Sequence, residues 1–107
     1  MNVLKKILLR QIGAKIAYYR TLRGLKQEEL AKLAHISQSV LSRIESGKYH
    51  ESISIPTLFD IADGLQIDMA LLVSFNDVEK QMWWRTLPTE LDDSSEVEVS
   101  PEVEEDV

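Results

Sequence analysis

The sequence contains no cysteine, so neither a disulfide framework nor a cysteine-ligated zinc site can form. Its two histidines, His35 and His50, have no third potential ligand at a suitable spacing, so no metal site is expected. The early apolar run at 7–9 ends at Arg10 and is far shorter than the roughly 20 apolar residues of a membrane span. These absences favour a cytoplasmic protein that needs no cofactor and no membrane.

Catalytic motifs are missing as well. The chain has no glycine-rich phosphate loop, no Gly-x-Ser-x-Gly and no His-Glu-x-x-His, and it has no cysteine nucleophile. The sequence therefore argues against an enzyme. Its four glycines are interpreted as helix caps or spacers, and Gly13 is the one with the weakest explanation.

Positive charge is absent from one end of the chain. Residues 1–89 hold all 12 Lys and Arg with nine Asp and Glu, a net charge of +3, whereas residues 90–107 hold nine acids and no base. The overall charge of −6 is thus the sum of two unlike parts. Residues 89–107 also lack aromatics and are rich in Ser and acids, which predicts a disordered acidic tail whose simplest role is solubility.

Apolar residues recur at helical spacing through residues 3–75, and no strand-like alternation competes with them, which predicts an all-α fold. Gly24, Gly47 and Gly64 are placed as the residues that end three of the helices. The predicted helices run from Leu4 to Leu22, Lys26 to Ala34, Gln38 to Ser46, Pro56 to Asp63 and Asp68 to about Phe75. A further helix is expected to continue from Phe75 to about Arg85, before Pro88.

Two of these helices are short and separated by a tight turn, with Ser37 as the N-cap of the second. Such a pair crosses steeply, as in a helix-turn-helix, and the close crossing requires a small residue such as Ala31 on the first helix. In that first helix Leu30, Ala31 and Leu33 are expected to face inward.

The second short helix has two different faces. Its apolar positions are Val40, Leu41 and Ile44, which leaves polar side chains outward. Those outward residues are Gln38, Ser39, Ser42 and Arg43. Such side chains match the donors and acceptors that base edges present in the major groove of DNA.

The stretch Gln27-Glu28-Glu29-Leu30-Ala31, together with residues 36–48, resembles the Cro- and phage-repressor-type (XRE-like) helix-turn-helix regulators over about residues 10–73. The resemblance implies a five-helix lambda-repressor-like DNA-binding domain. We expect that domain at residues 1–75, a helical extension or linker at 76–88 and the acidic tail at 89–107.

Site residues follow from positions that match the family motif. The expected base contacts are Gln38, Ser39 and Arg43, and the expected phosphate contacts are Gln27, Ser37, Ser42, Ser46 and Lys48. Gln27 is also expected to steady the second short helix, which the resemblance makes the recognition helix. Arg20 and Glu45 match a family ion pair with a structural role.

Two departures from the family pattern affect the details. His35 occupies a turn position that is usually Gly, although His tolerates a left-handed backbone better than most residues. Glu51 in the following loop would repel a phosphate, which puts backbone contacts there in doubt.

The implied function is a sequence-specific transcriptional regulator, most simply a repressor that binds a roughly palindromic site on double-stranded DNA as a homodimer. One alternative is an antitoxin that neutralises a protein partner through residues 76–107, and another is an interaction module that has lost DNA binding. Trp83 and Trp84 are adjacent on the expected last helix, where they either pack on their own protein or form an interface.

Overall fold

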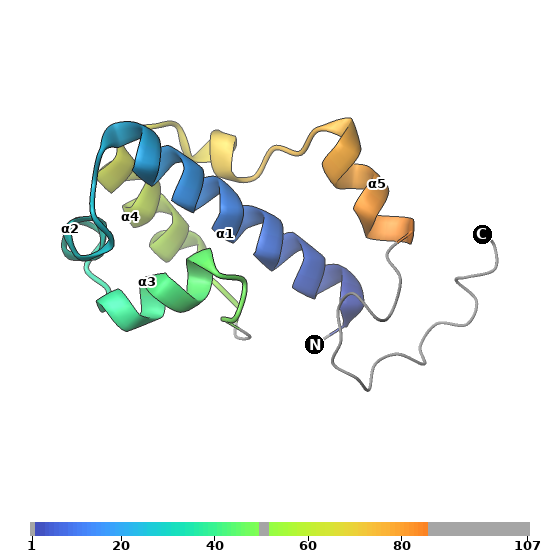
Figure 1. Ribbon diagram of the computed structural model, residues 1–107, viewed down its shortest axis with the longest axis horizontal. Coiled ribbons are helices and arrows are strands. Elements are labelled where there is room, and N and C mark those ends of the chain that lie inside the picture. The colour runs from blue at the N-terminus through green and yellow to red at the C-terminus, as the bar shows by residue number, and fades with distance from the viewer. Residues whose placement is uncertain (1, 50–51, 86–107) are drawn as a thin grey trace. The chain divides into compact units, whose positions relative to one another are not determined.

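The computed structural model describes residues 2–49 and 52–85 (Figure 1). Over these residues it contains only helices, in the order α1 (Val3–Arg23), α2 (Gln27–Leu33), α3 (Gln38–Glu45), α4 (Ile55–Leu65), the 3-10 helix η1 (Met69–Leu72) and α5 (Asp77–Arg85). The predicted all-α fold class is confirmed. The predicted acidic tail lies outside the described residues, and no helix in the described ranges is long and apolar enough to cross a membrane.

The described residues fall into two compact units. The larger unit is Leu9–Ser74, and the smaller one combines the start of α1, up to Leu8, with the segment from Phe75. The core of the larger unit draws a fully buried side chain from every helix it contains: Ile16, Leu30, Leu41, Ile44, Ile61, Leu65 and Leu72. Each such side chain contributes about 1.5–3 kcal/mol relative to an exposed one, so this core fixes α1 to α4 and η1 together.

The inward face of α2 differs by one residue from the sequence prediction. Leu30 and Ala31 are buried as predicted, but Leu33 is 50% exposed and Ala34 takes its place in the core. Ala34 is the C-cap of α2, and its backbone N–H donates to the carbonyl of Leu30 at 2.9 Å. Ala34 lies four residues after Leu30 and so shares its face of the helix, which the sequence alone did not distinguish from the spacing of Leu33.

Gly13 marks the closest approach between α1 and α3. A Cβ atom added at this glycine would overlap the carbonyl oxygen of Ile44. The glycine that the sequence left least explained is therefore required by the packing of the two helices. Because its partner lies 31 positions away in the sequence, no local pattern could reveal this role.

The helix ends confirm most of the predicted caps. The Ser37 hydroxyl accepts a hydrogen bond from the backbone N–H of Val40 at 3.1 Å, as expected of an N-cap. Gly24 and Gly47 end α1 and α3 with φ angles of 75° and 77°, values that favour glycine. His35 has φ of 61°, so the turn after α2 does use the left-handed conformation.

The prediction for the end of α4 was wrong. The helix continues through Gly64 to Leu65, and Gln66 is the left-handed C-cap with φ of 58°. Gly64 is instead a packing residue, because an added Cβ would lie 3.1 Å from both Leu30 Cδ1 and Leu33 Cβ. The missing side chain lets α4 approach α2 closely.

The region after Asp68 also differs from the prediction. The expected helix to Phe75 is only the single 3-10 helix η1, which ends at Leu72. Beyond it, Ser74 Oγ donates to the carbonyl of Ala70 at 2.7 Å. The additional helix exists as α5 but begins at Asp77. It begins there because Asn76 and Glu79 each accept the other's backbone N–H at 2.8 Å, a capping box.

Candidate nucleic-acid interface

The steep crossing of α2 and α3 is set by the short segment between them. In Figure 1 α2 is seen nearly end-on while α3 lies across the view, and the two helices are in contact. The backbone N–H of Ile36 donates to the carbonyl of Ala31 at 3.0 Å, which closes the turn around His35. Ala31 itself is 2% exposed, consistent with a small residue at the crossing.

The outward face of α3 is polar and open. Leu41 and Ile44 point into the core, whereas the four outward residues predicted from the sequence are all exposed: Gln38, Ser39, Ser42 and Arg43. Within residues 2–49 and 52–85 the side chains of Gln38, Ser39 and Ser42 have no hydrogen-bonding partner. Their donors and acceptors are therefore available to a ligand that approaches this face.

The C-terminal end of α3 brings further exposed donors to the same region. Ser46 Oγ donates to the carbonyl of Arg43 at 3.2 Å, and the backbone N–H of Lys48 donates to that carbonyl at 2.8 Å. Both Ser46 and Lys48 are exposed. The Lys48 backbone is thereby fixed shortly after the end of α3, which places a positive charge near that end of the helix.

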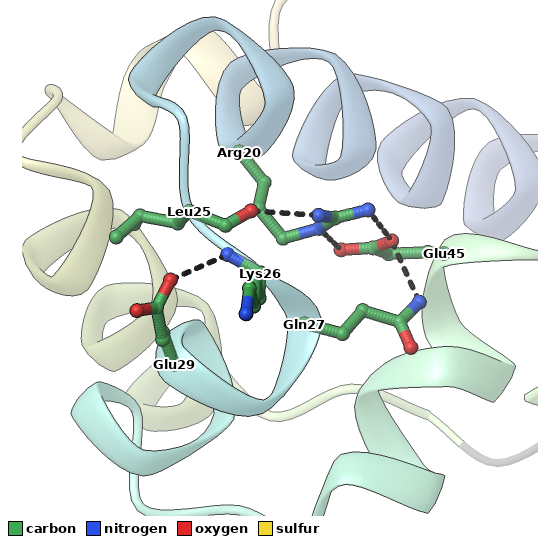
Figure 2. A network of polar contacts seen from close by, with 6 residues as sticks. All are labelled: Arg20, Leu25, Lys26, Gln27, Glu29 and Glu45. Carbon is green, nitrogen blue, oxygen red and sulfur yellow. Dashed lines mark hydrogen bonds and ion pairs between the residues drawn. The ribbon is translucent and has the colours of Figure 1, made fainter.

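Glu45 anchors this end of α3 to α1 through an ion pair with Arg20 (Figure 2). Arg20 Nε donates to Glu45 Oε2 at 2.7 Å, and Arg20 Nη2 donates to Glu45 Oε1 at 3.0 Å. The Arg20 side chain is 19% exposed and that of Glu45 only 6%. Arg20 Nη1 also donates to the carbonyl of Leu25 at 2.8 Å, so the guanidinium fixes the chain between α1 and α2 as well.

Gln27 links α2 to the same carboxylate. Its Nε2 donates to Glu45 Oε1 at 3.0 Å, and Figure 2 shows this amide directed at the carboxylate from the side opposite Arg20. Glu45 thus receives hydrogen bonds from two other helices. The steadying contact expected of Gln27 is present, whereas its expected contact with a phosphate stays a prediction.

Sequence reasoning missed the role of Arg23. Its Nε donates to the carbonyl of Leu65 and its Nη2 to that of Gln66, both at 2.8 Å. These carbonyls belong to the end of α4, where a helix has unsatisfied acceptors and a cation is favourable. The only local signal was a basic residue in the last turn of α1, which gave no indication of its distant partner.

Two further candidate residues, both tryptophans, lie on α5. Trp84 is 67% exposed on α5, and Trp83 is partly buried with its ring edge-on to Phe75 at 5.5 Å between centroids. The Trp83 and Trp84 rings lie 6.3 Å apart, also edge-on. Glu51, which was expected to repel a phosphate, lies outside the described residues, as does His50.

Comparison with known families identifies the family to which this arrangement of helices belongs. A family model described as helix-turn-helix (HTH_3) matches residues 16–72, more than half of the chain. The chain belongs to this helix-turn-helix family of DNA-binding transcriptional regulators. An uncharacterised HTH-type transcriptional regulator of Methanocaldococcus jannaschii is 35% identical over 65 residues, which are 61% of this chain and 96% of that protein. The XRE-type resemblance that the motif suggested is confirmed.

Solved structures of other helix-turn-helix regulators are similar to this one. The restriction-modification controller protein C.AhdI of Aeromonas hydrophila is 30% identical with a TM-score of 0.56, over 60% of this chain and 94% of its own. An HTH_3 family transcriptional regulator from Vibrio cholerae is 30% identical with a TM-score of 0.60, over 80% of this chain and 47% of its own. The clp gene regulator ClgR from C. glutamicum, at 24% identity and a TM-score of 0.58 over 69% of this chain and 88% of its own, shares the fold.

Proposed function

We propose that this protein is a sequence-specific repressor that binds a roughly palindromic operator as a homodimer, with α3 in the major groove. The observation that carries the proposal is the outward face of α3, where exposed polar side chains stand on a helix that Glu45 holds rigidly to α1 and α2. A reading helix needs this combination, because base discrimination depends on donors and acceptors held at a fixed angle to the groove. The protein acts in the cytoplasm and needs no cofactor.

Base reading is assigned to Gln38, Ser39 and Arg43. The Gln38 amide can donate to and accept from one adenine, and the Arg43 guanidinium can donate twice to one guanine. Ser39 is less selective, because a hydroxyl serves as donor or acceptor. All three are exposed.

Phosphate contacts are assigned to residues at the ends of α2 and α3. Lys48 supplies charge, and exposed hydroxyls supply hydrogen bonds. Gln27 can still contact a phosphate through the second hydrogen of its amide or through its backbone N–H, which has no partner among the described residues because it lies in the first turn of α2. The full set is Gln27, Ser37, Ser42, Ser46 and Lys48. These contacts fix the position of the protein on the DNA and carry no sequence information.

In a homodimer each copy would read one half-site, with half-sites about one helical turn apart on DNA. In this proposal residues 1–75 form the DNA-binding domain, residues 76–88 a helical extension and residues 89–107 an acidic tail. One observation favours an alternative, an antitoxin whose extension and tail bind a toxin protein: Trp84, separated by four residues from the acidic segment at 89–107, is 67% exposed.

The test begins with selection of bound sequences from a random DNA pool. A palindromic consensus supports the dimeric regulator, whereas no consensus contradicts sequence-specific binding. Arg43→Ala is then compared with wild type on selected and scrambled DNA at fixed salt. We expect the binding free energy to weaken by about 1–3 kcal/mol on selected DNA only, since one bidentate base contact is removed.

Lys48→Ala is the matched control, because it removes a positive charge from the same end of the helix. It should weaken binding to both DNAs equally, as expected for a phosphate contact. An equal loss on both DNAs for Arg43→Ala would instead make Arg43 a phosphate contact. For the antitoxin alternative, the chain must also capture a toxin-like protein, and removal of residues 76–107 must abolish that capture while DNA binding persists.

A further inference from the structure

Arg10 lies on α1 beside the segment that follows α3. A Cβ atom added at Gly47 would lie 3.1 Å from Arg10 Cγ and 3.4 Å from Arg10 Cβ, so the stem of this arginine packs against the glycine. Gly47 is followed directly by Lys48, which is exposed. Two basic residues from different parts of the chain, Arg10 and Lys48, therefore meet at this one glycine.

The position of Arg10 relative to α3 is fixed by the packing of α1. Three residues later on the same helix, Gly13 lies directly against the carbonyl oxygen of Ile44. Ten residues after Arg10, Arg20 holds Glu45 through two hydrogen bonds. Because all three contacts join one continuous helix to the C-terminal end of α3 and the glycine after it, the backbone of Arg10 cannot move independently of them.

The charge of Arg10 has no partner within the protein as far as residues 2–49 and 52–85 show. Arg10 is exposed, and its guanidinium makes no hydrogen bond or ion pair with any of these residues. The other two arginines of α1 differ, because Arg20 bonds a carboxylate and Arg23 bonds two carbonyls at the end of α4. The acid at this end of α3, Glu45, is already occupied by Arg20 and Gln27. The guanidinium of Arg10 is therefore available to an anion from outside the chain.

We propose that Arg10 is a further DNA contact, which binds a backbone phosphate next to the one assigned to Lys48. The chemistry of the side chain suits this ligand, because the planar guanidinium can donate two parallel hydrogen bonds to phosphate oxygens. Since the stem already packs against Gly47, less rotamer freedom is lost when the phosphate binds. The proposal rests on the proposed function and adds a residue to its DNA-binding surface.

The helix-turn-helix motif gives no indication of this contact. Arg10 lies outside residues 16–72, which the family model matches, and outside the segment from which the other phosphate contacts were assigned. The proposed contact instead follows from the packing of α1 on α3, which brings a residue 37 positions before Gly47 next to it. The DNA-binding surface would thus extend from α3 onto α1.

The test measures the salt dependence of DNA binding by full-length Arg10→Gln, on selected and on scrambled DNA. Gln retains the Cβ and Cγ atoms that touch Gly47 and removes only the charge. The slope of log K against log salt should become shallower by about 0.9 per bound copy, the value for one phosphate on duplex DNA. On the same basis affinity should fall about eightfold at 0.1 M salt and about fourfold at 0.2 M. Both DNAs should lose equally, since a phosphate carries no sequence information.

Three matched variants accompany this measurement. Lys48→Gln should reproduce the change in slope, and Arg10→Lys, which keeps the charge, should retain the wild-type slope. Lys32→Gln removes the same charge from an exposed residue in the last turn of α2, and it should lose less than about twofold in affinity, because salt screens distant charges.

Two results would overturn the phosphate contact while the proposed function stands. One is an Arg10→Gln protein with the same slope and affinity as Lys32→Gln, and the other is a loss confined to selected DNA, which would indicate a base contact. Absence of DNA binding by the wild-type protein would instead refute the proposed function, and the Arg10 contact with it. An equal loss on both DNAs, with the shallower slope restored by Arg10→Lys, would establish the contact.

Discussion

The guanidinium carbon of Arg43 lies 5.5 Å from the centre of the Tyr49 ring, within the range of a cation–π contact. Tyr49 is partly buried and packs on the core, whereas Arg43 is exposed. The partly buried ring therefore restricts where the exposed guanidinium can lie in the protein without DNA. A free Arg side chain carries about 2 kcal/mol of rotamer entropy, part of which this contact removes in advance.

This relationship predicts a specificity effect at a residue assigned to no base or phosphate. Tyr49→Leu should reduce preference for selected over scrambled DNA roughly two- to fivefold, since the contact is worth about 0.5–1 kcal/mol at an exposed site. Tyr49→Phe keeps the ring and should retain the preference. Binding to both DNAs is measured at fixed salt, with melting curves to verify the fold. An unchanged preference in Tyr49→Leu would mean that the contact does not position Arg43.

Glu45→Ala should destabilise the protein although Glu45 lies on no outward position. The substitution leaves the Arg20 guanidinium, 19% exposed, without its carboxylate, and it removes the partner of Gln27. We expect a loss of about 3 kcal/mol in the free energy of unfolding, the low end for breaking a buried pair. Urea unfolding measures it. Glu28→Ala, at an exposed acid on α2, is the control and should shift stability by less than about 0.5 kcal/mol. Equal midpoints for Glu45→Ala and wild type would contradict a structural role.

Gly13→Ala should also destabilise the protein, against the intrinsic preference of Ala for helices. Ala gains about 1 kcal/mol over Gly within a helix, but here its methyl group would overlap the backbone oxygen of Ile44 and force α1 from α3. Overpacking of this kind costs about 1–3 kcal/mol before any relief. Gly64→Ala should lose less stability, because the nearest neighbours of its methyl group are side-chain atoms at 3.1 Å, which can shift more easily than backbone atoms. Thermal melting compares the two, and a Gly13→Ala protein more stable than wild type would show that the helices can separate freely.

The sequence was most informative where structure is determined locally. Ser37 and Gly47 mark the two ends of α3. The Ser37 hydroxyl accepts the backbone N–H of Val40, three residues later, and Gly47 adopts a positive φ that favours glycine. Gly13 and Arg23 went unrecognised because their partners, Ile44 and the end of α4, are distant in sequence. The Arg20–Glu45 pair was anticipated only from family resemblance, since 25 residues separate its members and no spacing rule links them. Base and phosphate contacts remain predictions, as they depend on DNA.

The charge division along the chain predicts an effect of the acidic segment. Removal of residues 90–107 changes the net charge from −6 to +3, so a protein of residues 1–89 should bind DNA more tightly. The gain should shrink as salt rises, because screening limits such forces to about 8 Å at physiological ionic strength. DNA affinity of both proteins at two salt concentrations measures it. A ratio near one at both concentrations, or one that grows with salt, would contradict an electrostatic role.

The inward face of α3 is constrained by folding, whereas the outward face is not. This difference affects which residues of the helix can change during evolution. Leu41, Ile44 and Glu45 hold the inward side, whereas Gln38 and Ser39 have no hydrogen-bonding partner within the described residues. Under the proposed base-reading role, mutations at those two positions can therefore change the DNA sequence that the protein prefers while the protein still folds. Arg43 is coupled to Tyr49, so these two residues are expected to change together as operators diverge.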